Sequence, residues 1–168
     1  MTVFTLADAE RAHDEWGANC GPGALSAIMN MTLDEIKPIM FAVGFEDRLY
    51  TNPSMMNAAL RIIRRPWRKI GARWPDYGLV RVQWEGPWTQ PSVPMVARYR
   101  YTHWIGHFRG QNSRGVFDIN CMNNGTGWCA IDDWERVIAP ALCGNYPRAS
   151  GGWHITHGIE IEKPAESR

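Results

Sequence analysis

The sequence lacks any long apolar run. No segment approaches the roughly 20 consecutive apolar residues that a membrane-spanning helix requires, so we expect no membrane partner. The first ten residues also lack the basic stretch and apolar core that are typical of a secretory signal. The sequence therefore predicts a protein of the cytoplasm.

An excess of charge of either sign is absent as well. Eighteen Lys and Arg residues stand against seventeen Asp and Glu residues, a formal net charge of +1, which gives no general attraction to nucleic acid. The local exception is a basic run from Arg61 to Arg73, accompanied by Trp67 and Trp74. Such a run can bind phosphates and stack on bases. We favour a simpler interpretation, the solvated side of a helix end whose aromatic residues pack on the core, and expect no nucleic-acid partner.

Cysteine is scarce, with four residues in a chain of 168. In a reducing compartment Cys121, Cys129 and Cys143 are expected to be free, buried thiols rather than disulfide partners. The composition predicts no particular oligomeric state.

The spacing of the possible metal ligands is also unfavourable. His103 with His107, or His154 with His157, could complete a metal site together with two of the cysteines. No two cysteines, however, have the short separation that is typical of a structural zinc site. We therefore expect no metal and no other cofactor.

The order of the predicted elements indicates an α+β fold, because helices come first and an antiparallel sheet follows. Apolar residues recur at helical spacing in residues 22–31, 33–40, 53–65 and 131–142. Thr32 and Glu35 form a capping box at the second helix, which Pro38 is expected to kink or end early. Extended segments are predicted for residues 80–83, 93–101, 103–109, 116–120 and 155–162. The length argues for a single domain, residues 1–168.

Cys20 is the most informative residue. It directly precedes an apolar helical run, where the unpaired N–H groups and the positive end of the helix dipole favour thiolate over thiol. Pro22 suits the first helical turn, and Gly21 and Gly23 allow a backbone to approach closely. This stretch therefore predicts an activated nucleophile.

A base and a carboxylate follow the cysteine in the chain. His103 lies on a predicted strand that places His107 on the same face, and we prefer His103 as the base, with His107 in a supporting role. Asp118 and Asn120 share a face of the next strand, and either could orient the imidazole. Cysteine, histidine and aspartate in this order are typical of nucleophilic catalysis.

At these residues the sequence resembles the papain-like cysteine peptidases, and it looks closest to the small bacterial and phage branch similar to peptidases that process bacteriocin leaders. The matching pieces are Asn19–Ala24, His103–Ile105 and Phe117–Ile119. The resemblance implies a papain-like fold, with an N-terminal helical half packed on a twisted antiparallel β-sheet. It also implies that Cys20 is the nucleophile, His103 the general base and acid, and Asp118 the orienting partner.

One departure from that family concerns the oxyanion hole. Family members carry a glutamine five or six residues before the cysteine, where this chain has Asp14 and Glu15. An ionised carboxylate cannot donate a hydrogen bond to an oxyanion, and losing one good donor costs roughly 3 kcal/mol. Asn19, His13 or Trp16 could supply a substitute donor.

The resulting prediction is a cysteine-dependent hydrolase that cleaves a peptide or isopeptide bond of a peptide or protein substrate through an acyl-enzyme. Deamidation or acyl transfer would use the same three residues. The alternative of another class is a catalytically weak or inactive papain-like binding protein, a phage or bacterial modulator of a host protein. Asp14 and Glu15 favour this alternative, whereas Cys20, His103 and Asp118 together oppose it.

Overall fold

The computed structural model describes residues 4–164, so both ends of the predicted 1–168 domain, residues 1–3 and 165–168, lie outside the described residues. Five helices come first: α1 (Leu6–Trp16), α2 (Cys20–Met29), α3 (Leu33–Ala42), α4 (Phe45–Arg48) and α5 (Pro53–Ile63). The six strands are β1 (Trp67–Gly71), β2 (Tyr77–Trp84), β3 (Thr102–Arg109), β4 (Arg114–Phe117), β5 (Trp128–Ala130) and β6 (Trp153–Ile161). The connections carry η1 (Pro87–Thr89), α6 (Met95–Arg98), η2 (Ile119–Asn124), α7 (Ile131–Asp133), the π-helical η3 (Trp134–Ile138) and α8 (Ala139–Cys143).

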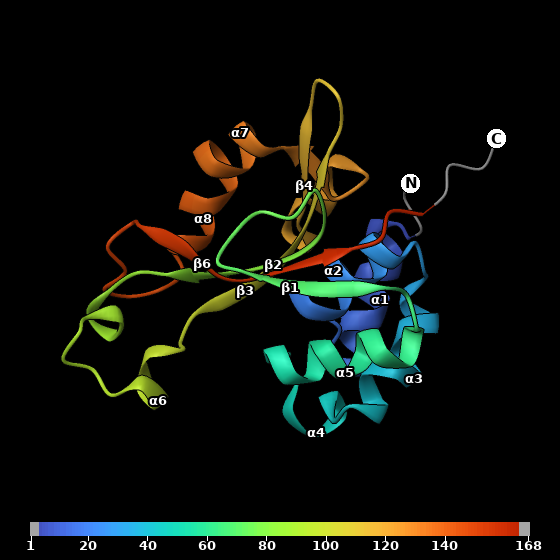
Figure 1. Cartoon of the computed structure of the whole chain (residues 1–168), viewed down its shortest axis with the longest axis horizontal. Helices are drawn as coiled ribbons and strands as arrows, with labels where there is room; N and C mark the ends of the chain where they lie inside the picture. The colour runs from blue at the N-terminus through green and yellow to red at the C-terminus, as the bar shows by residue number, and fades with distance from the viewer. Residues whose placement is uncertain (1–3, 165–168) are drawn as a thin grey trace.

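The strands form one antiparallel sheet in the order β1-β6-β2-β3-β4-β5. Helices α1 to α5 gather on one side of it, and α7 and α8 lie on the other (Figure 1). This mixture of helices and antiparallel strands confirms the predicted α+β class. Within residues 4–164 we find no helix with both the length and the apolar character needed to cross a bilayer.

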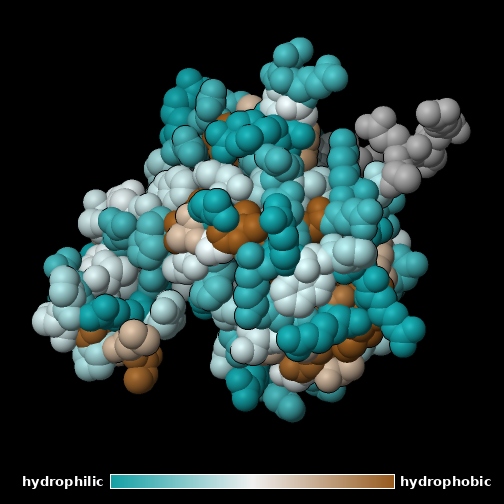
Figure 2. Space-filling model, in the orientation of Figure 1, coloured by the Kyte–Doolittle hydropathy of each residue, from teal (hydrophilic) through white to brown (hydrophobic). Residues whose placement is uncertain are grey.

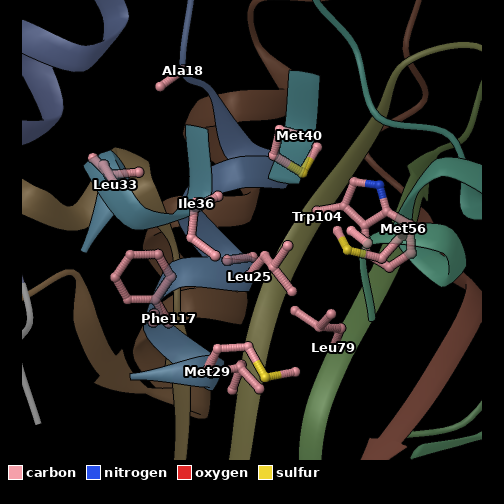
Figure 3. Packing of buried hydrophobic residues seen from close by; sticks show 14 of the residues in the cluster. Ala18, Leu25, Met29, Leu33, Ile36, Met40, Met56, Leu79, Trp104 and Phe117 are labelled. Carbon is pink, nitrogen blue, oxygen red and sulfur yellow. The ribbon is translucent and has the colours of Figure 1, made fainter. Parts of the chain in front are cut away.

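Strand alternation gives the sheet an apolar cluster on each face. Leu79 and Trp104 pack with Leu25 of α2 and the other N-terminal helices (Figure 3). Val80 and Ile105, one residue along each strand, pack instead with the tryptophan-rich layer around α7 and α8. Successive side chains of a strand point to opposite faces, so one sheet serves both clusters. The helix-side face is the one that carries α2 and hence Cys20.

Two predicted features of the helical half have different outcomes. The capping box is confirmed: the Glu35 N–H donates to Thr32 Oγ1 at 3.2 Å, and the Thr32 N–H donates to Glu35 Oε2 at 2.7 Å. Pro38 does not end the helix, because α3 continues to Ala42. The carbonyl that Pro38 leaves unpaired belongs to exposed Asp34, where water can satisfy it, while Met40 is fully buried and anchors the last turn.

The prediction of an extended segment over residues 93–101 was wrong. These residues form a loop with the short helix α6, and β3 begins only at Thr102. Proline cannot donate a ladder hydrogen bond, and Pro91 and Pro94 interrupt the segment. Tyr101 then adopts the left-handed conformation, with φ of 52°, immediately before the strand.

The basic run also has a different local structure from the predicted helix end. Helix α5 stops at Ile63, and Arg68 and Lys69 lie exposed on the edge strand β1, which pairs with β6. The aromatic residues pack as expected, Trp67 against the helix-side cluster and Trp74 against the opposite one. The run is therefore a solvated strand edge, and charged side chains on such an edge discourage strand addition.

Candidate active site

The N-terminus of α2 positions Cys20. Asn19 caps the helix by accepting from the Gly21 N–H at 3.3 Å, and its amide group donates to the Leu49 carbonyl at 2.8 Å. Cys20 is the first helical residue and is partly buried. Its own N–H is one of the helix-terminal donors that have no intrahelical partner. Because Asn19 caps the helix, the thiol and the free backbone N–H of Cys20 both lie at the N-terminus of α2.

The segment 49–52 crosses the start of α2. Besides the Asn19 contact, the Thr51 carbonyl accepts from the indole N–H of Trp104 at 2.8 Å. A Cβ at position 21 would collide with the Thr51 hydroxyl, so only glycine allows this approach. The contacts fix the thiol against strand β3.

His103 and Asp118 form a buried pair. The distance from His103 Nε2 to Asp118 Oδ2 is 2.9 Å, the imidazole is only 6% exposed, and the carboxylate is fully buried. The other ring nitrogen, Nδ1, is therefore the one left for Cys20. His103 lies at the start of β3, and Asp118 directly follows β4, whose pairing with β3 begins at Gly106. The two side chains therefore meet beyond the end of the β3–β4 pairing, where the two strands are no longer hydrogen-bonded to each other.

Asp118 is held by further donors. The indole N–H of Trp134 donates to Oδ2 at 2.9 Å, and the backbone and side-chain N–H groups of Asn120 both donate to Oδ1 at 2.9 Å. Hydrogen bonds to an ionised carboxylate keep it ionised. Of the two residues that the sequence offers as partners of the imidazole, Asp118 contacts the ring directly, and Asn120 donates hydrogen bonds to Asp118.

The electrostatics of the three residues agree with an ion pair. Burial raises the pKa of Cys20, but the charge of His103, a hydrogen bond to its ring and the backbone N–H of Trp104 bring the pKa of the thiol below its ordinary value. Burial lowers the pKa of His103, yet the charges of Asp118 and Cys20 raise it well above the usual value. For Asp118, burial raises the pKa, and His103, Trp134 and Asn120 lower it overall. Each of these shifts is in the direction of thiolate, imidazolium and carboxylate.

The remaining histidines of the sheet lie apart from this pair. His107 is fully buried; its ring N–H donates to the Pro75 carbonyl at 2.6 Å, and the ring packs on Trp74. Burial lowers the pKa of His107 to about 4, so the ring is neutral at pH 7. His154 pairs with Glu85 at 3.1 Å. In the part of the chain that the structure describes, no three His, Cys, Asp or Glu side chains form a group that could hold a metal ion.

The predicted substitute donors are placed very differently. The side-chain amide of Asn19 is used by Leu49. His13 is 70% exposed on α1, where its ring contacts Asp14. Trp16 packs edge to face on Phe41 and Phe45, and its indole N–H is buried without a hydrogen-bond partner.

The carboxylates at the position of the family glutamine point to solvent. The side chain of Asp14 is 83% exposed, and that of Glu15 is 51% exposed and pairs with Arg11 at 3.4 Å. Neither is among the charged groups that shift the pKa of Cys20. The carboxylates of Asp14 and Glu15 therefore do not repel a negative charge on Cys20.

Thr51 and Trp134 escaped the sequence analysis. The Thr51 hydroxyl is buried beside Gly21 and has no hydrogen-bond partner. Trp134 was predicted only as an apolar residue of a helix, but its indole N–H reaches the carboxylate of Asp118. Both residues act through contacts with distant parts of the chain, so no local sequence pattern predicts their roles.

The other thiols are free. Cys121 and Cys129 face each other with their sulfur atoms 3.9 Å apart, and Cys143 is buried in the cluster around α8. The hydrogen bond with Cys129 and burial raise the pKa of Cys121, which keeps it protonated. The same hydrogen bond lowers the pKa of Cys129, so what sets Cys20 apart from the other cysteines is that an imidazole lowers its pKa.

Comparisons of the chain with family models, with curated proteins and with solved structures found no match. The argument on function therefore depends on the geometry and chemistry of the site.

Proposed function

We propose that the protein is a cysteine-dependent hydrolase of papain-like fold that cleaves an amide bond in a peptide or protein. The observation that carries this proposal is the chain of contacts from Cys20 through His103 to Asp118. A merely structural cysteine needs no lowered pKa, and a merely structural histidine needs no buried carboxylate held by three further hydrogen bonds.

In the proposed mechanism the Cys20 thiolate attacks the carbonyl carbon, and a C–S bond forms as the carbonyl oxygen becomes an oxyanion. The His103 imidazolium gives its Nδ1 proton to the leaving nitrogen, the C–N bond breaks, and an acyl-enzyme remains. Water then attacks the thioester while His103 accepts a proton from it, and the thiolate leaves. Asp118 stabilises the imidazolium and fixes the ring orientation throughout.

The oxyanion would be met by the N–H of Cys20 at the start of α2 and by the unpaired hydroxyl of Thr51. The Cys20 N–H lies at the start of α2, Thr51 lies beside Gly21 in the segment that crosses this helix end, and the helix dipole would add to their effect. Thr51 would replace the glutamine that the resemblance leads one to expect. The indole N–H of Trp16 is also buried without a partner.

The test is cleavage of a peptide library derived from a bacterial proteome, with new amino termini identified by mass spectrometry. Wild type and Cys143→Ala should give the same cleavage sites, since Cys143 lies in the opposite cluster. Cys20→Ala should give none while melting within a few degrees of wild type. Cleavage that persists in Cys20→Ala would refute the proposal.

A second candidate, a binding protein on the same scaffold, is favoured by one observation: Asp14 and Glu15 occupy the glutamine position. Such a protein would show no Cys20-dependent cleavage, and its partner would bind Cys20→Ala as tightly as wild type. The first experiment and a pull-down with both forms therefore separate the two candidates.

A further inference from the structure

Arg81 is a buried cation in the middle of the sheet. It lies on β2 between Val80 and Val82 and is only 7% exposed. By alternation its side chain is on the helix-side face, with Leu79 and Gln83. Its direct cross-strand partner is Trp104, whose backbone N–H contacts the sulfur of Cys20. The guanidinium is therefore next to the candidate active site.

The guanidinium has no carboxylate partner, and the negative charge that acts on it most is the Cys20 thiolate. One of its terminal nitrogens donates to Thr102 Oγ1 at 3.0 Å, whereas Nε is buried without any hydrogen-bond partner. No ion pair joins Arg81 to a carboxylate within residues 4–164. A buried guanidinium with an unused N–H donor is costly, and a ligand can supply the missing acceptor.

A pocket lies near Arg81, and the Cys20 thiolate on its other side raises the pKa of Arg81. Gln83, Tyr99 and Thr156 line a pocket of about 310 Å³. Tyr99 interacts electrostatically with Arg81, and the Thr156 hydroxyl donates to the Arg81 carbonyl, so the pocket adjoins the arginine. Figure 2 shows a notch in the surface between the lobe that carries α6 and the helical lobe with α4 and α5.

A histidine lies beside Arg81 in the sheet. His157 is the partner of Arg81 on β6. Burial and the charge of Arg81 both lower the pKa of His157. A carboxylate bound between the two side chains would oppose this lowering and favour protonation of the ring.

We propose that Arg81 binds a carboxylate of the substrate, so that the enzyme prefers peptides with an acidic group beside the bond that Cys20 attacks. This inference rests on the proposed function for the identity of the bond, but the anion site itself does not. The free Nε–H and a terminal N–H of the guanidinium form the planar fork that holds a carboxylate with two parallel hydrogen bonds. The acidic group is either an Asp or Glu side chain or a C-terminal carboxylate.

Binding is tested first in Cys20→Ala, which removes any turnover. Three acetylated tripeptides are titrated while the side-chain Nε–H resonance of Arg81 is followed by NMR: Ala-Glu-Ala amide, Ala-Gln-Ala amide and Ala-Gln-Ala with a free carboxylate. We expect at least one acidic peptide to move this resonance and to bind roughly tenfold more tightly than the neutral peptide. The first acidic peptide reports side-chain recognition and the second reports C-terminal recognition. Equal affinities with an unmoved resonance would overturn the proposal.

The matched variants are Arg81→Met and Arg68→Met, which remove one positive charge each from the same sheet. Arg68 is exposed on β1. We expect Arg81→Met to lose the preference for the acidic peptide and to melt no lower than wild type, because it removes an unpaired buried charge. Arg68→Met should keep the preference. If Arg81→Met bound the acidic peptide as wild type does, Arg81 would not be the site.

Failure of this inference differs from failure of the proposed function. The titrations need no catalysis, so an anion site found in a protein without Cys20-dependent cleavage would leave the inference standing and remove the hydrolase. Cleavage without preference for acidic peptides would do the reverse.

Discussion

At the scale of single residues, the site combines one satisfied carboxylate with a few unsatisfied donors. Asp118 accepts from His103, Asn120 and Trp134, and its geometry leaves no room for another arrangement of the imidazole. By contrast, the Thr51 hydroxyl and the Nε of Arg81 are buried without partners. The satisfied carboxylate fixes the position of His103, and we propose the Thr51 hydroxyl and the Arg81 Nε–H as donors to a substrate.

Replacing Thr51 with valine tests its role as an oxyanion donor. The change keeps the shape of the side chain and removes a buried hydroxyl that has no partner, so the free energy of unfolding should not fall. Loss of one such donor should lower kcat on a cleaved peptide roughly 100-fold while KM changes little. Thr51→Ser, which keeps the hydroxyl, should retain most of the activity. Full activity in Thr51→Val would exclude Thr51 as a donor.

His107 makes the stability depend on pH. Because its pKa in the folded protein is lowered to about 4, its contribution is complete above the unfolded pKa of about 6.5 and is lost as the pH falls towards 4. The loss amounts to about 3 kcal/mol at most. Urea unfolding at pH 7 and pH 4.5 should show a smaller difference for His107→Gln than for wild type. Equal differences would contradict the assignment of a buried neutral ring.

At the scale of elements, the sequence predicts features that depend on neighbouring residues, but not features that depend on pairing between distant segments. The capping box at Thr32 and the asparagine cap at Asn52 depend on neighbouring residues, so the sequence alone predicts where α3 and α5 begin; the cap of α2 at Asn19 was not predicted. Strand β1 was missed because its pairing partner, β6, lies about ninety residues further along the chain, as the register of Trp67 with Ile161 shows. Local propensity cannot report such a pairing.

The close approach of β2 and β6 gives a prediction for one glycine. A Cβ at Gly78 would collide with the backbone carbonyl of Ile159, which cannot move without opening the ladder. Gly78→Ala should therefore cost about 3 kcal/mol of unfolding free energy. The control is Gly144→Ala, where φ is −60° and the nearest atom lies 3.4 Å from the new Cβ. Denaturant titration should leave the control within about 1 kcal/mol of wild type, and equal losses would contradict the predicted strand contact.

At the scale of the whole molecule, the sheet is the common support of both halves of the site. Its helix-side face holds α2 with Cys20, and the strand ends hold His103 and Asp118. The sequence predicts these three residues from short motifs that together span about a hundred positions. It does not predict Thr51, Trp134 or Arg81, because their contacts exist only once the 49–52 segment, η3 and β2 have come together.

The central claim is that Cys20 and His103 form a thiolate–imidazolium pair. The most direct measurement is the pH dependence of alkylation by iodoacetamide, with the labelled cysteine identified by peptide mass spectrometry. Because the pKa of Cys20 is lowered and that of His103 is raised, labelling of Cys20 should persist well below the ordinary thiol pKa of about 8.5. It should decline only as the pH falls through the lowered pKa, and His103→Ala should lose this low-pH reactivity. Labelling of wild-type Cys20 that rises only near that ordinary pKa, or no labelling of the folded protein, would contradict the account.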